Sequence, residues 1–438
     1  MESGKLRLLA LLPLLASLIL LYFDIFPQAY RSNCSLIQYR HFWIASKRIV
    51  TPSAIISGAV EVKGGKIISV VEGDDWRGKT WSNQVMDYGE AVVMPGLIDV
   101  HAHLDDPGRT EWEGFPSGTR AAAAGGITTL IDMPLNSFPS TVSEETLELK
   151  TKAAKGRIFV DVGFWGGLVP ENAFNASSLE RLLKAGALGL KSFMCPSGIN
   201  DFPMTNTSHI KEGLSVLAKY KRPLLVHAEI QQDFGMVDDG GNPRSYSTYL
   251  KTRPASWEEA AIRELLTEAK SSGDSITVET CPHYLAFSAE EIPDGDTRFK
   301  CAPPIRDADN KEKLWTALLV RQIWKCNSYA IMLSSDHSPS APGLKLFGEG
   351  DFLRAWGGIS SLQGSIATGF HADIVVWEPE VEFELDDNHP VYLKHPNISA
   401  YMGSNLTGKV LATFARGNLV YQDGKHAPIA CGVPILAT

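Results

Sequence analysis

The middle of the chain, roughly residues 94 to 360, alternates short apolar stretches with helical stretches, and this rhythm constrains the fold more than any other feature. Such a βαβ rhythm is typical of an α/β protein with a parallel sheet or barrel. A (β/α)8 barrel has eight strands and usually occupies about 250 residues. The apolar strand candidates lie at residues 93–100, 127–133, 158–164, 188–193, 223–226, 276–280 and 330–333. Because these are seven, we expect a barrel in which one strand is missing or unrecognised.

Short strands with glycine-rich turns occupy the regions on either side of this middle part. Residues 41–95 contain four strand candidates, and residues 372–377 and 409–421 alternate apolar and polar side chains. This alternation is typical of strands with one buried face. We expect these regions to pair into one small β-sandwich, built from residues 41–95 and 364–438, with the barrel of residues 96–363 inserted between them.

Charge and cysteine content narrow the classes of function. A formal net charge of −9 predicts no basic face for nucleic acid, and a small-molecule partner fits better. The six cysteines are scattered singly, without a C-x-x-C pair. This spacing does not indicate a zinc ribbon or a dense disulfide scaffold. We therefore expect the cysteines to be ordinary buried thiols.

The N-terminal segment, residues 1–30, differs in composition from the rest of the chain. Lys5 and Arg7 precede an apolar run at residues 8–23, which is the layout of a secretory signal. The run is shorter than the ~20 residues of a comfortable membrane span, and no clear cleavage site follows, so we favour a signal anchor over a cleaved signal peptide. Five N-x-S/T sequons are compatible with the secretory lumen. The sequence thus predicts the endoplasmic reticulum or secretory pathway, with membrane contact through this segment alone.

Two histidines end the first predicted barrel strand. His101 and His103 point to the same side, because side chains alternate along a strand, so both imidazoles can reach one metal ion. An isolated H-x-H pair is more often structural. The apolar strand before it and Asp105 just after it favour a metal site, because a barrel places its active site at the carboxyl ends of its strands.

Three further polar residues lie at the ends of later strands: Lys191 ends the fourth, His227 ends the fifth and Asp336 follows the last. A buried ammonium is costly, so Lys191 is either paired with a carboxylate or neutral. A neutral lysine can react with carbon dioxide to give a carbamate that bridges two divalent ions. Asp336 could be a helix cap, a metal ligand or a general base, and its place at the barrel mouth favours the last two. Two ions would supply hydroxide at neutral pH, which indicates a hydrolase.

Several segments of the chain resemble one known family. Residues 94–103 look like the opening motif of the amidohydrolase superfamily, in its dihydroorotase, hydantoinase and allantoinase branch. Residues 133–137, 189–193, 281–284, 300–306 and 335–339 are similar to plant-type allantoinases. The resemblance implies a (β/α)8 barrel beside a β-sandwich, and zinc-dependent hydrolysis of allantoin to allantoate in purine and ureide catabolism. The alternatives are another cyclic amidohydrolase, such as a hydantoinase or dihydropyrimidinase, and a noncatalytic homologue retained for assembly.

The resemblance also implies a set of ligands. His101, His103 and Asp336 would hold one zinc ion, Lys191 as N-carboxylysine would bridge it to a second ion, and His227 would belong to that second ion. Asp336 would also be catalytic, taking a proton from the attacking hydroxide and returning it to the leaving ring nitrogen. The family tends toward tetramers, so the resemblance implies a homo-oligomer.

The chain departs from the family pattern in two places. Family members carry one more histidine ligand on the sixth barrel strand, but here the helical run at residues 257–270 leads directly into the strand at 276–280. A late helical segment near Gln363 is also absent. His283 is not expected to replace the missing ligand, since its place in the family pattern is the seventh strand. We therefore expect an open seam, reduced stability, weak binding of the second ion and impaired activity.

Overall fold

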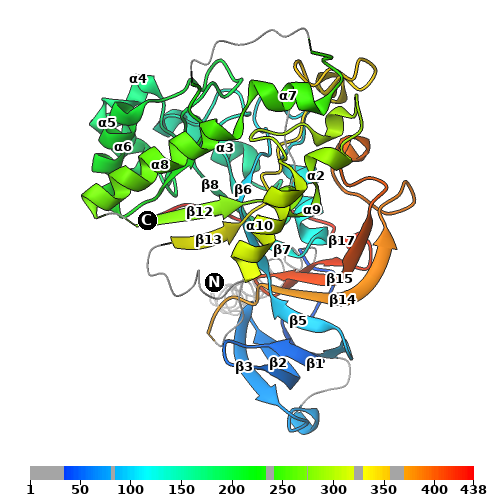
Figure 1. The fold of residues 1–438 in the computed structure, drawn as a ribbon. Helices are drawn as coiled ribbons and strands as arrows, with labels where there is room; N and C mark the ends of the chain where they lie inside the picture. The colour runs from blue at the N-terminus through cyan, green and yellow to red at the C-terminus, as the bar shows by residue number, and fades with distance from the viewer. Residues whose placement is uncertain (1–33, 80–83, 233–240, 274, 320–328, 356–368) are drawn as a thin grey trace, which may run out of the picture.

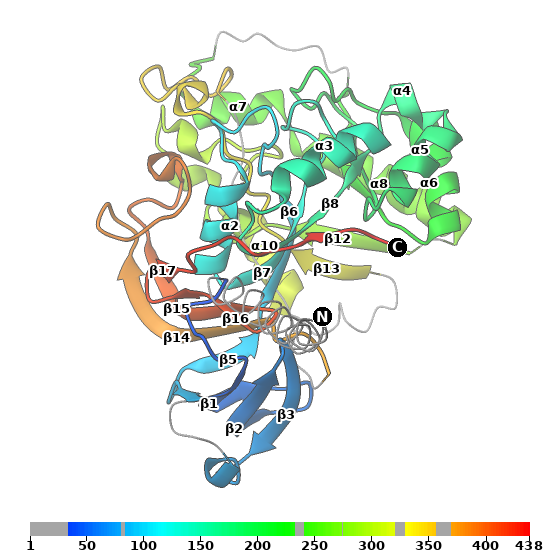
Figure 2. The same cartoon turned by 180° about the vertical axis from the view of Figure 1, so that it is seen from behind.

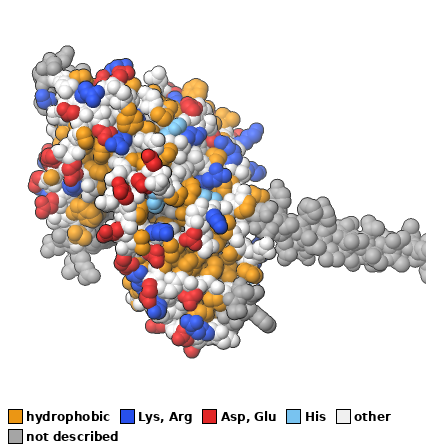
Figure 3. Space-filling model, turned by 90° about the vertical axis from the view of Figure 1, so that its right-hand side faces the viewer, with side chains coloured by type: hydrophobic (Ala, Val, Ile, Leu, Met, Phe, Trp, Pro, Cys, Tyr) orange, Lys and Arg blue, Asp and Glu red, His pale blue; other side chains and the backbone are white. Residues whose placement is uncertain are grey.

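The structure is a computed structural model that describes residues 34–79, 84–232, 241–273, 275–319, 329–355 and 369–438. Figure 1 shows two parts, a group of parallel strands covered by helices and a β domain below it. On the face shown in Figure 3, acidic and basic side chains are interspersed, so charge of either sign is spread over that face.

The β domain draws its strands from both sides of the barrel in the sequence. These are β1 (His41–Val50), β2 (Ile55–Lys63), β3 (Lys66–Glu72), β4 (Val85–Asp87), β5 (Val92–Pro95), β14 (Ile374–Glu384), β15 (Asn405–Ala415), β16 (Asn418–Gln422) and β17 (Lys425–His426). They form one nine-stranded sheet in the order β17-β16-β15-β14-β5-β1-β2-β3, with β4 paired to β1. The antiparallel pair β5 and β14 joins the two regions, and Phe42, Ile44, Val376 and Phe414 belong to the apolar core of this domain.

The strands of the other part, the barrel, are parallel and follow one another around it in chain order. They are β6 (Leu97–Ala102), β7 (Ile127–Asp132), β8 (Asp161–Phe164), β9 (Gly166–Gly167), β10 (Leu190–Phe193), β11 (Leu224–His227), β12 (Ile276–Thr280) and β13 (Tyr329–Leu333). Pairing runs β6-β7-β8, then β9-β10-β11, then β12-β13. Trp165 alone separates β8 from β9, and a bridge between Ala102 and His337 connects the end of β6 to the segment after β13. The short strand β18 (Pro434–Ile435) pairs with β8.

Helices pack outside these strands, as Figures 1 and 2 show. They are α2 (Phe115–Ala124), α3 (Glu144–Ala154), α4 (Pro170–Ala173), α5 (Ala176–Lys184), α6 (Thr207–Tyr220), α7 (Tyr246–Thr252), α8 (Ala255–Ser272), α9 (Pro282–Ala286) and α10 (Ala308–Leu319). Short 3-10 helices are η1 (Arg77–Lys79), η3 (Ala289–Glu291), η4 (Thr297–Phe299), η5 (Pro342–Lys345) and η6 (Pro396–Ile398). Helix α5 shows why they pack so, because Leu179, Leu182 and Leu183 lie on one buried face at helical spacing.

Gly96 divides the strand that the sequence predicted at residues 93–100. Strand β5 ends at Pro95 in the β domain, and β6 begins at Leu97 in the barrel. A Cβ atom at Gly96 would lie 2.2 Å from the Thr128 side chain, so only glycine fits where the chain passes from one sheet to the other. The prediction of a single strand was wrong here, because apolar content does not show which sheet a residue joins.

An open seam lies between the barrel strands β11 and β12. Among the described residues, β11 and β12 are not paired with each other. Val278 on β12 is 40% exposed and Met332 on β13 is 36% exposed, although both belong to barrel strands. The predicted fold class, an amidohydrolase-type barrel beside a small β domain, is confirmed. The seam falls where the sequence predicted that a strand is absent.

Two of the six cysteines contradict the expectation of ordinary thiols. Cys34 and Cys431 form a disulfide with a Cα–Cα distance of 5.5 Å across a sequence separation of 397 residues. Spacing along the chain carried no signal for this pair, because the fold brings the two positions together. Cys195, Cys281 and Cys301 are buried free thiols, and Cys326 lies outside the described residues.

The predicted localisation requires correction. A membrane-spanning helix needs ~20 consecutive apolar residues, and none of the helices in the described part of the chain is long and apolar enough to cross a membrane. Helix α8, with 18 residues, carries Glu258, Glu259 and Arg263. The predicted signal anchor at residues 1–30 lies outside the described residues. The assignment to the endoplasmic reticulum or secretory pathway is therefore withdrawn.

Candidate metal centre

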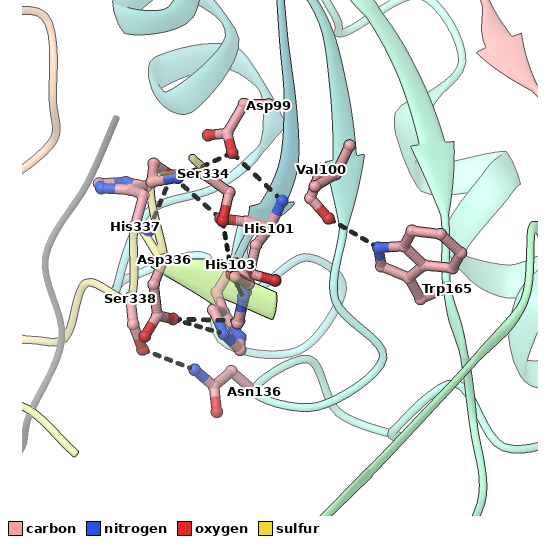
Figure 4. Close-up of polar contacts among 12 residues, drawn as sticks. Asp99, Val100, His101, His103, Asn136, Trp165, Ser334, Asp336, His337 and Ser338 are labelled. Carbon is pink, nitrogen blue, oxygen red and sulfur yellow. Dashed lines mark hydrogen bonds and ion pairs between the residues drawn. The ribbon is translucent and has the colours of Figure 1, made fainter. Parts of the chain in front are cut away.

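Three predicted site residues meet at the carboxyl ends of β6 and β13. His101 Nε2 lies 3.1 Å from Asp336 Oδ1, and His103 Nε2 lies 3.5 Å from the same oxygen. Figure 4 shows both imidazoles directed at this carboxylate. Ligand atoms of the three residues lie within 4.8 Å of one another. Two imidazole nitrogens and one carboxylate oxygen are a donor set that fits a divalent ion such as zinc.

Buried hydrogen bonds hold the two strand ends together. The Asp99 carboxylate accepts from the backbone N–H groups of His101, at 3.2 Å, and of Ser335, at 3.0 Å. Burial raises the pKa of Asp99 to about 6, and these hydrogen bonds oppose the rise. The backbone N–H of His103 donates to the carbonyl of His337 at 2.7 Å. The sequence separation between these strands is large, so only the barrel fold brings them into contact.

The turns after three strands use residues that tolerate left-handed backbone. Asp105, Asn136 and Asp336 have φ values of 60°, 70° and 48°, and they follow β6, β7 and β13. Aspartate and asparagine occupy this region more readily than most other residues. The Asn136 side chain donates to the Ser338 hydroxyl at 3.4 Å, which joins two of these turns (Figure 4).

A buried ion pair supports the loop that carries His103. Lys150 Nζ lies 2.7 Å from Asp132 Oδ2, and the side chains are 1% and 0% exposed. The other oxygen of Asp132 accepts from the backbone N–H of Leu104 at 2.8 Å. The pair therefore links helix α3 to the end of β7 and to the residue after His103.

Replacing Lys150 with methionine is expected to lower the free energy of unfolding by about 3–5 kcal/mol, because Asp132 would remain buried without its partner. Chemical denaturation measures the change. Lys313→Met serves as the control, because Lys313 and Asp309 form a pair on α10 whose side chains are both 73% exposed. The control should leave stability unchanged within error. Equal stability of the two variants would contradict a structural role for the buried pair.

Burial and neighbouring charges together determine which of the two histidines carries a proton in the absence of a metal ion. Burial opposes a charge on His101, but the Glu279 and Asp336 carboxylates outweigh it and raise the pKa of His101 to about 9. Burial lowers the pKa of His103 to about 4. Burial would raise the pKa of Asp336, yet the two histidines hold it well below its usual value. At neutral pH, His101 is therefore protonated, His103 neutral and Asp336 ionised.

The metal-free protein is expected to bind Zn²⁺ more tightly as the pH rises. A proton must leave His101 before Nε2 can coordinate an ion, and the pKa of about 9 keeps that proton in place at neutral pH. Release of one proton should raise the apparent affinity about tenfold per pH unit until the pH reaches that pKa. Chelator competition titrations at about pH 7 and about pH 8 measure the slope. Equal affinities would contradict His101 as a ligand.

Lys191 lies on β10, close to this group. Its side chain is 3% exposed, and burial lowers its pKa while the Glu279 and Asp336 carboxylates oppose that change. No ion pair of Lys191 occurs within the described part of the chain, and its Nζ lies 5.2 Å from the centre of the Phe193 ring. The alternative of a lysine in direct salt bridge with a carboxylate is therefore not what the structure shows.

His227 takes part in a different group. Its ring stacks on Phe193 with centroids 4.5 Å apart, and its Nε2 lies 2.6 Å from Glu229 Oε2. Arg253 also pairs with Glu229, and Cys195 lies beside it. The structure thus groups His227 with Cys195 and Glu229, not with His101, His103 and Asp336.

Glu279 is a site residue that the sequence analysis missed. It lies on β12, and its Oε1 is 2.6 Å from His101 Nδ1. A charged residue inside a short strand next to an apolar core is as unusual as Lys191 on β10, so the same argument could have found it. His283 is fully buried, with both ring nitrogens lacking a hydrogen-bond partner among the described residues, and no candidate metal group there includes it.

A cleft opens beside Asp336. Its lining includes Glu113, His337 and Tyr401. Glu113 Oε2 and His337 Nε2 approach each other at 3.4 Å, but neither atom has a hydrogen-bond partner in the described chain, nor has the Tyr401 hydroxyl. Buried polar groups without partners next to a possible metal centre are typical of a site for a small polar ligand.

Comparisons with known proteins point in one direction. Two family models match, "Allantoinase, composite domain" at residues 37–91 and "Amidohydrolase family" at residues 92–270. An allantoinase from Arabidopsis thaliana is 60% identical, with 98% of each chain covered. A probable allantoinase from Oryza sativa is 55% identical, covering 100% of this chain and 99% of the relative. An L-hydantoinase from Arthrobacter aurescens has the same fold, with a TM-score of 0.80, 23% identity and coverage of 91% and 100%.

The length of one of these alignments indicates that this chain lacks residues that its relative has. The alignment with the Arabidopsis relative spans 503 positions, whereas this chain has 438 residues. The relative therefore contains positions that have no counterpart here. This agrees with the break in strand pairing between β11 and β12.

Proposed function

Because the chain belongs to the allantoinase family of the amidohydrolases, we propose that it hydrolyses the cyclic amide of allantoin to allantoate. The observation that carries this proposal is the convergence of His101, His103 and Asp336 at the mouth of the barrel. Similarity at 60% identity over the whole chain favours allantoin over other cyclic amides as the substrate.

The three residues are proposed to hold a zinc ion or another divalent ion. Such an ion would act as a Lewis acid and supply hydroxide at neutral pH. The residues fit the ion, because both Nε2 atoms already face the Asp336 carboxylate and the three side chains are largely shielded from water. Shielding strengthens each electrostatic contact in the site.

Asp336 is proposed as the residue that moves the proton. Its carboxylate is ionised at neutral pH, so it can accept a proton from the attacking hydroxide. The same carboxyl group can then donate that proton to the leaving ring nitrogen. Its contact with His101, together with a cleft lined by the next residue, His337, supports this role.

Lys191 is proposed to become N-carboxylysine and to bridge to a second ion that His227 would help to hold. A lowered pKa favours the neutral amine that reacts with carbon dioxide. His227 would have to leave its contact with Glu229, and the described residues between β11 and β12 include no strand that could carry a further ligand. The second ion is therefore proposed to bind weakly.

Allantoate release by the purified chain tests the proposal. We expect release from allantoin to be abolished by a chelator, restored by Zn²⁺ and absent in His101→Ala. Hydantoin and dihydropyrimidine rings complete the substrate panel, and turnover of these rings alone would favour the hydantoinase alternative.

The open seam favours one other candidate, a noncatalytic homologue. Absence of turnover by the isolated chain, together with its recovery only in hetero-oligomers, would support that candidate. The homo-tetramer remains a prediction.

A further inference from the structure

We propose that Glu279 is a positioning residue for His101, which holds the imidazole so that Nε2 faces the metal ion. The inference rests on the proposed metal centre, and it adds a residue outside the ligand set. Glu279 Oε1 lies 2.6 Å from His101 Nδ1, whereas His101 Nε2 lies 3.1 Å from Asp336 Oδ1. The two carboxylates thus contact opposite nitrogens of one ring.

A histidine ligand coordinates an ion through one nitrogen only, and the hydrogen bond at the other nitrogen decides which one is free. A carboxylate at Nδ1 keeps the hydrogen there and leaves the lone pair on Nε2. It also makes the ligand nitrogen more basic, which strengthens its bond to a cation. Glu279 satisfies this geometry for His101.

His103 provides a contrast within the same centre. Its Nδ1 is buried and has no hydrogen-bond partner among the described residues. The two ligands therefore differ, because an outer carboxylate contacts His101 and none of the described residues makes such a contact with His103. We expect the affinity of the centre to depend strongly on the contact between Glu279 and His101.

The strands on one side of the seam hold Glu279 in place. Strand β12 pairs with β13 in parallel, and Glu279 lies opposite Met332. The Ser334 hydroxyl, just after β13, donates to the Glu279 carboxylate. Because Asp336 follows on the same segment, the pair β12 and β13 delivers a ligand and the residue that orients a second ligand. This first ion site does not use the missing strand.

Metal titration of Glu279→Gln tests the proposal. Metal-free wild type and variant are titrated with Zn²⁺ against a chromophoric chelator, and the variant is expected to bind about 10- to 100-fold more weakly, as is usual when an outer partner of a ligand is lost. Co²⁺ serves as the spectroscopic probe, and its visible ligand-field bands should shift in Glu279→Gln because the orientation of His101 changes. Ser334→Ala, which leaves the carboxylate in place, should give a smaller loss of affinity.

Glu258→Gln is the matched control. Glu258 pairs with Arg306, and its side chain is 29% exposed, compared with 22% for Glu279. Thermal unfolding identifies any variant that fails to fold, and Ser334→Ala then carries the test. Unchanged Zn²⁺ affinity and Co²⁺ spectrum in Glu279→Gln, or equal losses in Glu258→Gln, would overturn the proposal. These readouts do not use turnover, so lack of allantoate release would count against the proposed function alone.

Discussion

Replacing Asp336 with asparagine is expected to lower allantoate release about 1000-fold or more, because a general base contributes about 10²- to 10⁴-fold and this side chain is also a proposed ligand. Asparagine has nearly the same shape, but it cannot accept a proton at neutral pH. Its amide also removes the negative charge that faces His101 and His103 at 3.1 and 3.5 Å. Initial rates with allantoin, measured at saturating Zn²⁺, give the size of the effect.

Two measurements separate the roles of Asp336. Metal analysis of the variant shows whether the ion is still bound, and loss of turnover with the ion retained assigns proton transfer to Asp336. Asp386→Asn is the control, because Asp386 lies in an exposed turn where its carboxylate contacts the backbone N–H groups of Asn388 and His389. The control should keep the wild-type rate. Wild-type turnover in Asp336→Asn would remove Asp336 from both proposed roles.

The purified chain is expected to hold one tightly bound divalent ion, with the second ion bound at least about 100-fold more weakly, because even an outer partner of a ligand is worth about 10- to 100-fold. Among the described residues, strands β11 and β12 do not pair with each other, and His227 contacts Glu229, which does not belong to the first group of ligands. Replacing residues 266–275 with the corresponding segment of the Arabidopsis relative should supply a sixth strand. The chimera is then expected to hold two ions and to turn over allantoin faster.

The control chimera carries a glycine- and serine-rich insertion of equal length at the same place. It adds chain but neither a strand nor a ligand, so it should bind one ion tightly, as the present chain does. Metal content after gel filtration and the thermal midpoint distinguish the two chimeras. Two tightly held ions in the unmodified chain, together with the activity of a complete allantoinase, would contradict this account of the seam.

Much of the fold could be predicted because its signals are local. The βαβ rhythm and the apolar strand before His101 indicated a parallel barrel, and the count of seven strands indicated a gap. Boundaries were less certain where one apolar run serves two sheets, as at Gly96, because the change of sheet depends on contact with Thr128. The disulfide between Cys34 and Cys431 could not be predicted, since no local pattern links two residues separated by 397 positions in the sequence.

Some residues of the candidate site could likewise be predicted from the sequence, and others could not. Strand-end positions identified His101, His103 and Asp336, because parallel strands end at one edge of a barrel. The same rule placed His227 with them, but its side chain pairs with Glu229 beside the seam. Glu279 was missed because the rule considers residues at strand ends, whereas Glu279 lies one position before the last residue of β12.

The sequence by itself determined the family, the barrel class and the three residues whose side chains converge, because short motifs and the periodicity of strands are properties of adjacent residues. Only the tertiary structure decided which ring nitrogen faces which carboxylate, that Lys191 is buried without an ion pair to any described residue, and that His227 contacts Glu229. These outcomes depend on contacts between segments far apart in the chain. Burial and neighbouring charge act on a side chain only after such segments have packed together.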